Sequence, residues 1–248
     1  MASIELKHVS VVFTIYDSTT RSLTRRILST RLGGRIGSGG RYASLIQALS
    51  DVNLTIKHGD RVGIVGHNGA GKTTLLRVMA GLYEPCEGEA IIQGHIAPLF
   101  NISLGMDPDL NGYDNIFLRG IFLGLKRREI AGMVDDIAEF TELGEFLDLP
   151  IRTYSAGMRM RLAFAISTAI KPDILLLDEG IGAGDAAFLE KAKKRLSDFT
   201  QRAGVIVLAS HSNSLIRQIC NSAILMERGR VMAVGSVDEI LRLYAANK

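Results

Sequence analysis

The chain has 248 residues, of which 47% are hydrophobic and 22% are charged. This length suits one large α/β domain or a core domain with a smaller lobe, and the ordinary composition argues against widespread disorder. No apolar run approaches the roughly 18–20 residues that span a bilayer, and no charged-then-apolar leader is visible, so we expect a soluble or peripheral protein. Cys86 and Cys220 match no metal or redox spacing and are expected to be free thiols in a reducing cytosol.

A basic segment interrupts the first part of the chain. Residues 17–47 contain six arginines and one aspartate, so this segment has a net charge of +5 in a chain whose total is +3, which leaves −2 elsewhere. Such a segment favours an anionic partner such as phospholipid, lipid phosphate or nucleic acid, although a solvated surface insertion explains it too. Within it, residues 21–32 are compatible with a short helix, and Gly33–Gly40 is predicted to be a flexible link.

Apolar periodicity predicts strands and helices that alternate along the rest of the chain. The predicted strands are 3–15, 48–56, 61–65, 89–93 and 95–100 paired around Gly94, 173–177, 204–209, and two within 221–234. The predicted helices are 73–82, 129–143, 159–170, 187–202, 214–220 and 237–246. This alternation predicts an α/β fold with a mainly parallel sheet, and the helical stretch 106–172 predicts a separate lobe.

A glycine-rich loop lies between a predicted buried strand and a predicted helix. Its residues are Gly66, His67, Asn68, Gly69, Ala70, Gly71, Lys72 and Thr73, followed by Thr74. The spacing is that of a P-loop, in which glycines let backbone N–H groups point at phosphate oxygens and the helix N-terminus adds positive potential. The loop therefore predicts ATP binding, with Lys72 reaching the β and γ phosphates and Thr73 ligating Mg²⁺. The His67 side chain is expected to be a bystander.

Two carboxylates follow the apolar run Ile174–Leu177. The carboxyl ends of parallel strands are where ligands bind, so Asp178 is predicted to hold Mg²⁺ and Glu179 to polarise the attacking water. His211 follows another apolar run and is predicted to reach the γ-phosphate and the water. Each of these residues alone has an ordinary structural explanation. The P-loop in the same chain is what favours the catalytic interpretation.

The segment Tyr154–Leu162 resembles the signature of ABC ATPases, usually Leu-Ser-Gly-Gly-Gln, although Ala156 and Met158 depart from it. The order of P-loop, signature, Asp178-Glu179, Gly184-Asp185 and His211 makes the whole chain similar to that family. The resemblance implies a P-loop NTPase core with a mainly parallel sheet, an antiparallel β subdomain and a helical subdomain. In this chain the core would be 1–105 and 173–248, and the helical subdomain 106–172.

The resemblance also implies a head-to-tail homodimer. Ser155, Ala156 and Gly157 would bind the ATP held by the P-loop of the other copy. Asp185 would belong to the D-loop that links the two sites, and His211 would be the switch histidine.

Two further positions follow from the resemblance, each with a question left open. An aromatic residue near the end of the first strand should stack on adenine, where Phe13 fits by position and Tyr16 competes. The family's Q-loop glutamine, which contacts Mg²⁺, has Asn101 as its nearest equivalent. The shorter asparagine side chain leaves direct metal contact open.

A narrower resemblance points to a substrate. Segments 106–116, 123–125 and 139–146 are similar to those of ATPases that export O-antigen, teichoic acid, capsule and galactan, as is an insertion between the first strands. This implies ATP hydrolysis coupled to a membrane permease at the cytoplasmic face of the inner membrane, with a lipid-linked polysaccharide as cargo. Residues 17–47 would contact the inner leaflet or the lipid diphosphate, and no nucleic-acid partner is expected. A C-terminal carbohydrate-binding domain, which some O-antigen members carry, is not expected either.

Other functions stay open at this point. A non-transport ABC ATPase acting on nucleic acid or the ribosome fits the basic segment, but the chain has neither a long coiled-coil insertion nor a second ATPase domain. An ATPase of another ABC transporter class is the next alternative, which segment 106–146 disfavours. A nucleotide-binding regulator without turnover is the last, and Glu179 and His211 argue against it.

Overall fold

The structure, a computed structural model, describes residues 1–16, 36–39, 43–100, 104–178 and 186–246. The chain divides into two compact units. The first consists of Met1–Gly94 and Gly204–Lys248, and the second of His95–Ala203. Buried apolar residues occur in both units.

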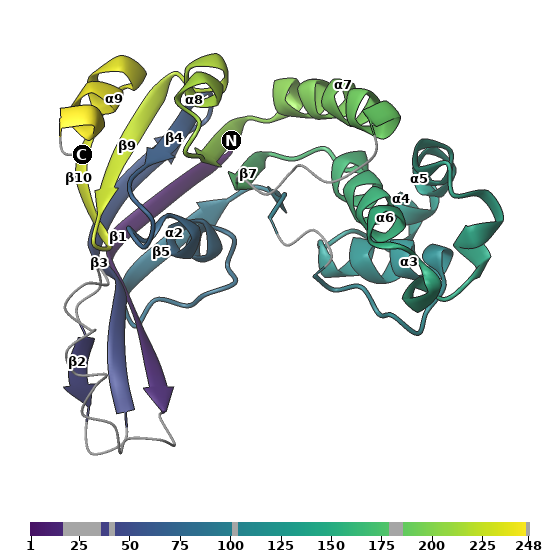
Figure 1. Cartoon of the computed structure of the whole chain (residues 1–248), viewed down its shortest axis with the longest axis horizontal. Coiled ribbons are helices and arrows are strands. Elements are labelled where there is room, and N and C mark those ends of the chain that lie inside the picture. The colour runs from purple at the N-terminus through teal and green to yellow at the C-terminus, as the bar shows by residue number, and fades with distance from the viewer. Residues whose placement is uncertain (17–35, 40–42, 101–103, 179–185, 247–248) are drawn as a thin grey trace. The chain divides into compact units, whose positions relative to one another are not determined.

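An antiparallel sheet forms one part of the first unit. Its strands, in the order β2-β3-β1-β5, are β2 (Ile36–Gly39), β3 (Ala43–Lys57), β1 (Ser3–Tyr16) and β5 (Glu87–Gln93). β1 and β3 are long and run side by side as a ribbon from Ser3↔Lys57 to Tyr16↔Ala43 (Figure 1). Their alternating apolar residues form the buried face, as the pattern predicts for a half-buried sheet. The predicted strands 3–15 and 48–56 are confirmed, and β3 is the longer of the two in the structure.

Two predictions about this sheet are wrong. The glycine-rich stretch was expected to be a link, yet Ile36–Gly39 is an edge strand that pairs with β3. On the side away from β1, backbone N–H and C=O groups of β3 would otherwise be unpaired, and the short strand β2 pairs with some of them. The strands predicted around Gly94 are both present, but they do not pair with each other. β5 pairs with β1, whereas β6 (Ile96–Pro98) runs parallel to a strand of the second unit. The predicted helix at 21–32 lies outside the described residues.

A mainly parallel sheet forms the rest of the first unit. Its central strand β4 (Arg61–Val65) lies between β8 (Val205–Ala209) and β9 (Ser222–Glu227), both parallel to it, and β10 (Arg230–Ser236) is antiparallel to β9. The helices of this unit are α2 (Lys72–Met79), α8 (Asn213–Ile219) and α9 (Val237–Ala246), and α9 packs beside β9 and β10 (Figure 1). β8 is buried along its whole length, which explains its uninterrupted apolar sequence. The predicted parallel sheet is confirmed.

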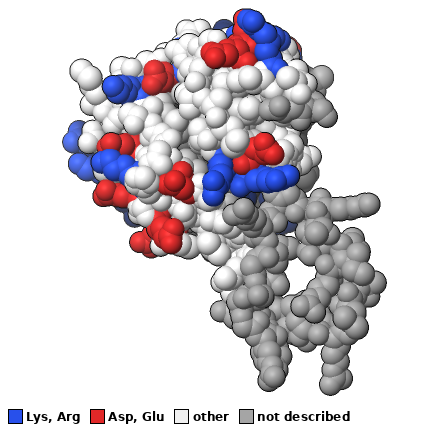
Figure 2. Space-filling model, turned by 90° about the vertical axis from the view of Figure 1, so that its left-hand side faces the viewer, with Lys and Arg blue, Asp and Glu red and all other residues white. Residues whose placement is uncertain are grey.

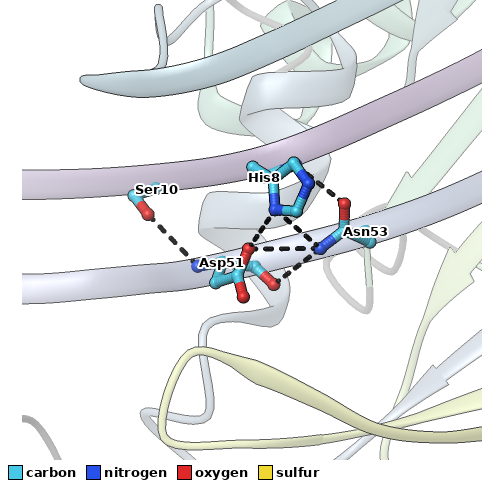
Figure 3. Close-up of polar contacts among 4 residues, drawn as sticks. All are labelled: His8, Ser10, Asp51 and Asn53. Carbon is cyan, nitrogen blue, oxygen red and sulfur yellow. Dashed lines mark hydrogen bonds and ion pairs between the residues drawn. The ribbon is translucent and has the colours of Figure 1, made fainter.

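A polar cluster joins β1 and β3 where both strands are irregular (Figure 3). His8 and Asp51 each have a φ of +52°, in the left-handed region that non-glycine residues seldom adopt. His8 Nδ1 lies 2.7 Å from Asp51 Oδ1, Asn53 Oδ1 accepts from His8 N at 2.9 Å, and Asp51 N donates to Ser10 Oγ at 3.1 Å. The hydrogen bond from His8 holds the pKa of Asp51 below its usual value. These bonds stabilise the register of the ribbon across its bulges.

The second unit is mostly helical, and its helices cluster together in Figure 1. It contains the parallel pair β6 and β7 (Ile174–Asp178), and the helices α3 (Gly112–Phe122), α4 (Arg127–Ala131), α5 (Val134–Thr141), α6 (Ala156–Ala169) and α7 (Ala186–Arg202), with short 3-10 turns at Gly144–Asp148 and Ile151–Thr153. The helix predicted at 129–143 is two helices, because the chain leaves helical geometry after Ala131 and restarts at Val134. Phe140, Phe164 and Phe188 join α5, α6 and α7, with ring centroids 5.6–6.2 Å apart.

Candidate functional site

The predicted phosphate loop connects β4 to α2 in the first unit. Gly66 is buried, and a Cβ placed there would lie 2.4 Å from the carbonyl oxygen of Met226, so no larger residue fits without a backbone shift. Gly69 and Gly71 have φ values of +80° and +102°, which glycine adopts without strain. Gly71 is the N-cap of α2 and lacks a capping side chain. The loop therefore wraps around the start of a helix whose first N–H groups are not capped by a side chain, as phosphate binding requires.

Lys72 spans the loop from the first position of α2. Its Nζ donates to the carbonyl oxygens of Gly66 at 2.7 Å and His67 at 3.0 Å. These bonds hold the ammonium group over the loop. Thr73 is exposed in the first turn of α2, and Thr74 is half-buried.

Backbone hydrogen bonds and close contacts with neighbouring strands hold the loop in place. The turn between β9 and β10 donates from Gly229 N to Ala70 O at 2.9 Å, and Gly229 O accepts from Ser50 N of β3 at 2.9 Å. A Cβ on Gly71 would lie 2.8 Å from the carbonyl oxygen of Ala48. The loop backbone is thus fixed by both sheets of the unit. His67 and Asn68 are exposed at the loop tip, where His67 Nδ1 lies 2.7 Å from the Asn68 carbonyl oxygen.

His211 is exposed just beyond β8, after the buried Ser210. Because β8 runs parallel to β4 with Ile64 opposite Ala209, the phosphate loop and His211 leave the same edge of the sheet. Ser210 Oγ accepts from Ser212 N at 3.0 Å, which shapes the turn that follows the strand. The first unit thereby holds the P-loop and the predicted switch histidine together.

The second unit holds Asp178 and the signature segment. Asp178 is half-buried at the end of β7. Ser155 is the N-cap of α6, and its Oγ accepts from Met158 N at 3.2 Å. Ser155 and Ala156 are exposed and Gly157 is half-exposed, so this helix presents its N-terminus to solvent. An exposed helix N-terminus with a serine and a glycine is suited to an anion such as a phosphate.

The residue before the signature is firmly anchored. Tyr154 is 3% exposed, and its hydroxyl donates to the Phe146 carbonyl oxygen at 2.6 Å. Burial raises the pKa of Tyr154 to about 12, so it stays a neutral donor. Arg159 Nη1 donates to the Tyr154 carbonyl oxygen at 2.7 Å. These bonds fix the start of α6.

Sequence reasoning missed a buried arginine that connects α3 to α6. Arg119 is 2% exposed; it donates to the Leu104 carbonyl oxygen and, at 3.0 Å, to Ser167 Oγ. Its Nε has no hydrogen-bond partner in the described part of the chain. Burial lowers the pKa of Arg119 to about 10. Its place after an apolar turn of α3 gave no local signal for a polar role.

The adenine candidates differ in what the structure says of them. Phe13 lies on β1 opposite Ile46, is half-buried, and meets Tyr83 edge to face with ring centroids 5.3 Å apart. Tyr16 ends β1 opposite Ala43, and its side chain is outside the described part. The choice between them therefore stays open. Asn101, Glu179 and Asp185 also lie outside the described residues, so their predicted roles stay predictions.

Comparisons with known proteins agree with these motifs. A family model described as ABC transporter matches residues 49–182. The O-antigen export system ATP-binding protein RfbE of Yersinia enterocolitica is 44% identical over 231 residues, which cover 93% of this chain and 97% of that protein. The teichoic acids export ATP-binding protein TagH of Listeria monocytogenes is 35% identical over 97% of this chain and 69% of its own length. A dimeric structure of a bacterial ABC transporter cassette has a TM-score of 0.65 and 25% identity, covering 94% of this chain and 98% of that one.

Proposed function

This chain belongs to the ABC transporter family of ATP-binding proteins, and we propose that it is the ATP-hydrolysing subunit of an exporter of lipid-linked polysaccharide. The family makes the chain an ABC ATPase. The cargo rests on one observation, the 44% identity to an O-antigen export ATPase over 97% of that protein's length. The similarity to a teichoic acid export ATPase supports the same class of cargo.

The phosphate loop supplies the ATP-binding part of the proposal. Backbone N–H groups of residues 66–74 would hold the phosphates, and Lys72 would move from the loop carbonyls to the β and γ phosphates. Phe13 or Tyr16 would stack on the adenine. The fixed loop backbone supports this role, because it would bind phosphate oxygens without a rearrangement of the backbone.

The residues that would hold Mg²⁺ match the chemistry of that ion. Mg²⁺ prefers oxygen ligands and commonly takes few from the protein, the rest being water and phosphate. Thr73 offers an exposed hydroxyl and Asp178 a half-buried carboxylate, and Asn101 would add an amide oxygen. When bound, the ion neutralises charge that develops on the phosphates. Glu179 would accept a proton from the attacking water, and His211 would stabilise the γ-phosphate.

A second copy of the chain would complete each site. Ser155, Ala156 and Gly157 at the exposed start of α6 would contact the γ-phosphate bound to the other copy, and Asp185 would link the two sites. The exposure of this helix N-terminus to solvent supports the proposal. The related bacterial cassette has a dimeric structure.

A membrane permease would be the second partner, at the cytoplasmic face of the inner membrane. Among the described helices, none is both long and apolar enough to cross a bilayer. The subdomain at 106–172 would pass the ATP-driven motion to the permease, with 1–105 and 173–248 as the core. The arginines of residues 17–47 would face the inner leaflet or the lipid diphosphate, since guanidinium groups pair well with phosphate.

We expect no nucleic-acid partner, and Figure 2 shows the charge on one face of the described residues. Lysine, arginine, aspartate and glutamate side chains are interspersed over the described residues of that face. Nucleic-acid binding favours a continuous basic surface. The mixed charge visible there is that of an ordinary solvated surface.

Two experiments test the proposal. ATP hydrolysis by the purified chain should fall roughly 100-fold or more in Glu179→Gln, because general-base catalysis contributes about that much. Equal rates in both proteins contradict the catalytic assignment.

Replacing Arg25 and Arg26 by glutamate should lower glycan export while leaving basal hydrolysis unchanged. The matched control replaces the exposed Lys193 and Lys194 by glutamate, which changes the charge equally; equal export by both variants contradicts the role of the insertion.

A further inference from the structure

The end of α2 places an aromatic residue beside the helix it has just left. Gly81 has a φ of +69°, Gly81 N donates to Val78 O, and Leu82 N donates to Arg77 O, each at 2.9 Å. This is a Schellman ending, in which a left-handed glycine turns the chain back across the last helical turn. Tyr83 N also donates to Arg77 O at 3.3 Å. The turn therefore carries Tyr83 back to Arg77.

Arg77 then fixes the Tyr83 ring. Arg77 Nη1 donates to the Tyr83 hydroxyl oxygen at 2.8 Å in a partly buried contact, and the guanidinium carbon lies 5.4 Å from the ring centroid. A planar guanidinium bonded to a phenol holds the ring more rigidly than apolar packing alone does. α2 begins at Lys72 of the phosphate loop. One helix thus orients both Lys72 and Tyr83.

The segment after Tyr83 is attached to β1 around Phe13. Cys86 N donates to Ser10 O at 2.8 Å, and Val12 N donates to Cys86 Sγ at 3.4 Å. Tyr83 meets Phe13 with centroids 5.3 Å apart and planes 72° from parallel. An edge-to-face contact occupies at most one face of the Phe13 ring, so it can orient that ring without consuming both faces.

We propose that Tyr83, held by Arg77, is a positioning residue for the base of ATP. Tyr83 fixes the Phe13 ring at the angle that stacks on adenine and links this ring to the helix that carries the phosphate-binding lysine. The inference rests on the proposed stacking role of Phe13. Base and phosphates are then oriented by opposite ends of α2, which fixes the distance between the two binding elements.

The test compares two probes that differ in the base. Dissociation constants of ATP and of inorganic tripolyphosphate are measured with Mg²⁺ on the full chain carrying Glu179→Gln to prevent turnover. Tyr83→Ala should weaken ATP binding about threefold to tenfold, the scale of one aromatic pair, and leave tripolyphosphate binding unchanged. Tyr83→Phe, which keeps the ring but not the bond to Arg77, should show a smaller loss. Phe13→Ala should weaken ATP alone, and adding Tyr83→Ala to it should have no further effect.

Each other outcome contradicts a distinct step. If Phe13→Ala weakens ATP binding and Tyr83→Ala does not, the positioning role is wrong and the proposed function stands. Equal losses for ATP and tripolyphosphate in Tyr83→Ala indicate general damage to the fold and also overturn it. If Phe13→Ala does not change ATP binding, another aromatic residue such as Tyr16 stacks on the base, and the premise of the proposal is wrong. If Tyr83→Ala does not fold, Tyr83→Leu is measured in its place. If the chain that carries Glu179→Gln alone does not bind ATP, the proposed function itself is overturned.

Discussion

Asn115 makes a sharp prediction about stability, because its amide organises the loop before α3. Asn115 is fully buried. Its Oδ1 accepts from Asp107 N at 2.8 Å, and its Nδ2 donates to the carbonyl oxygens of Asp107, Leu110 and Asn111 at 2.9–3.1 Å. All of these groups belong to one segment of the second unit. Asn115→Ala removes the four bonds at once.

The loss in the free energy of unfolding depends on which hydrogen bonds each partner group keeps. Leu110 O also accepts from Ile151 N, Asn111 O accepts from Asn115 N, and Asp107 O accepts from Leu110 N, so these carbonyls retain a donor. The Asp107 N–H loses its acceptor. Asp107 is half-buried, so its orphaned N–H costs toward the lower end of about 1–3 kcal/mol, and the lost bonds and the small cavity add about 1 kcal/mol more. We therefore expect the free energy of unfolding to fall by about 2–3 kcal/mol.

Urea unfolding of the full chain measures this loss, followed by circular dichroism because the chain has no tryptophan. Asn111→Ala is the matched control. Asn111 Oδ1 caps α3 by accepting from Asp114 N at 2.8 Å, which is worth about 1 kcal/mol. Asn115→Asp should be worse than alanine at neutral pH, because a carboxylate would face three carbonyls, and should recover partly as the acid is protonated. A loss in Asn115→Ala no larger than that in Asn111→Ala would refute the reasoning.

Three further predictions follow from the site and the thiols. Gly66→Ala should weaken ATP binding more than tenfold in a nucleotide titration, because the added methyl group would overlap a carbonyl of β9. The control is Gly69→Ala, whose added methyl group meets nothing within 4 Å and which bears only about 1–2 kcal/mol of backbone strain. Equal effects of the two substitutions on ATP binding would contradict the steric argument. At pH 8 a thiol reagent should label exposed Cys86 and spare Cys220, because burial raises the pKa of Cys220 to about 12 and keeps it a neutral thiol in the folded chain; rapid labelling of both would show that Cys220 is accessible. Ser155→Ala should lower the free energy of unfolding by about 1 kcal/mol through the lost N-cap, and it should also reduce ATP-driven dimerisation measured by light scattering. A loss of stability with unchanged dimerisation would show that Ser155 caps the helix but does not bind the ligand.

Local signals in the sequence predicted most strands and helices, but not their partners. β4 and β8 are short apolar runs between turns, and their parallel pairing follows from the alternation of strands and helices. β5 and β6 flank Gly94 and resemble a hairpin, yet each pairs elsewhere. The competing partners are distant in sequence, so local periodicity does not identify them. The edge strand β2 was missed for the same reason, since its pairing is supplied by β3.

The candidate site was predictable where function depends on contiguous backbone. The phosphate loop needs glycines at fixed spacing, and the structure shows at Gly66 and Gly71 why larger residues do not fit. The contact between Tyr83 and Phe13 was not predictable, because it depends on a helix ending and on a segment pairing with β1 across many residues. Arg119 was missed because its partners are a distant backbone carbonyl and a serine of another helix.

The structure also changes how the export-like segment 106–116 is interpreted. Its two asparagines at 111 and 115 bond to the backbone of the same segment. Part of the resemblance to polysaccharide exporters is therefore explained by the fold of a loop. The similarity over the whole chain carries the cargo proposal instead.

Glycan transport in cells tests polysaccharide export most directly. In a host lacking its own copy, the wild-type chain or Glu179→Gln is expressed with the permease, and the glycan is quantified at the cell surface and on its lipid carrier inside. We predict that the wild type restores surface glycan and that the variant leaves lipid-linked glycan accumulated at the inner leaflet. Equal surface glycan with the wild type, the variant and no chain at all would contradict a role in export.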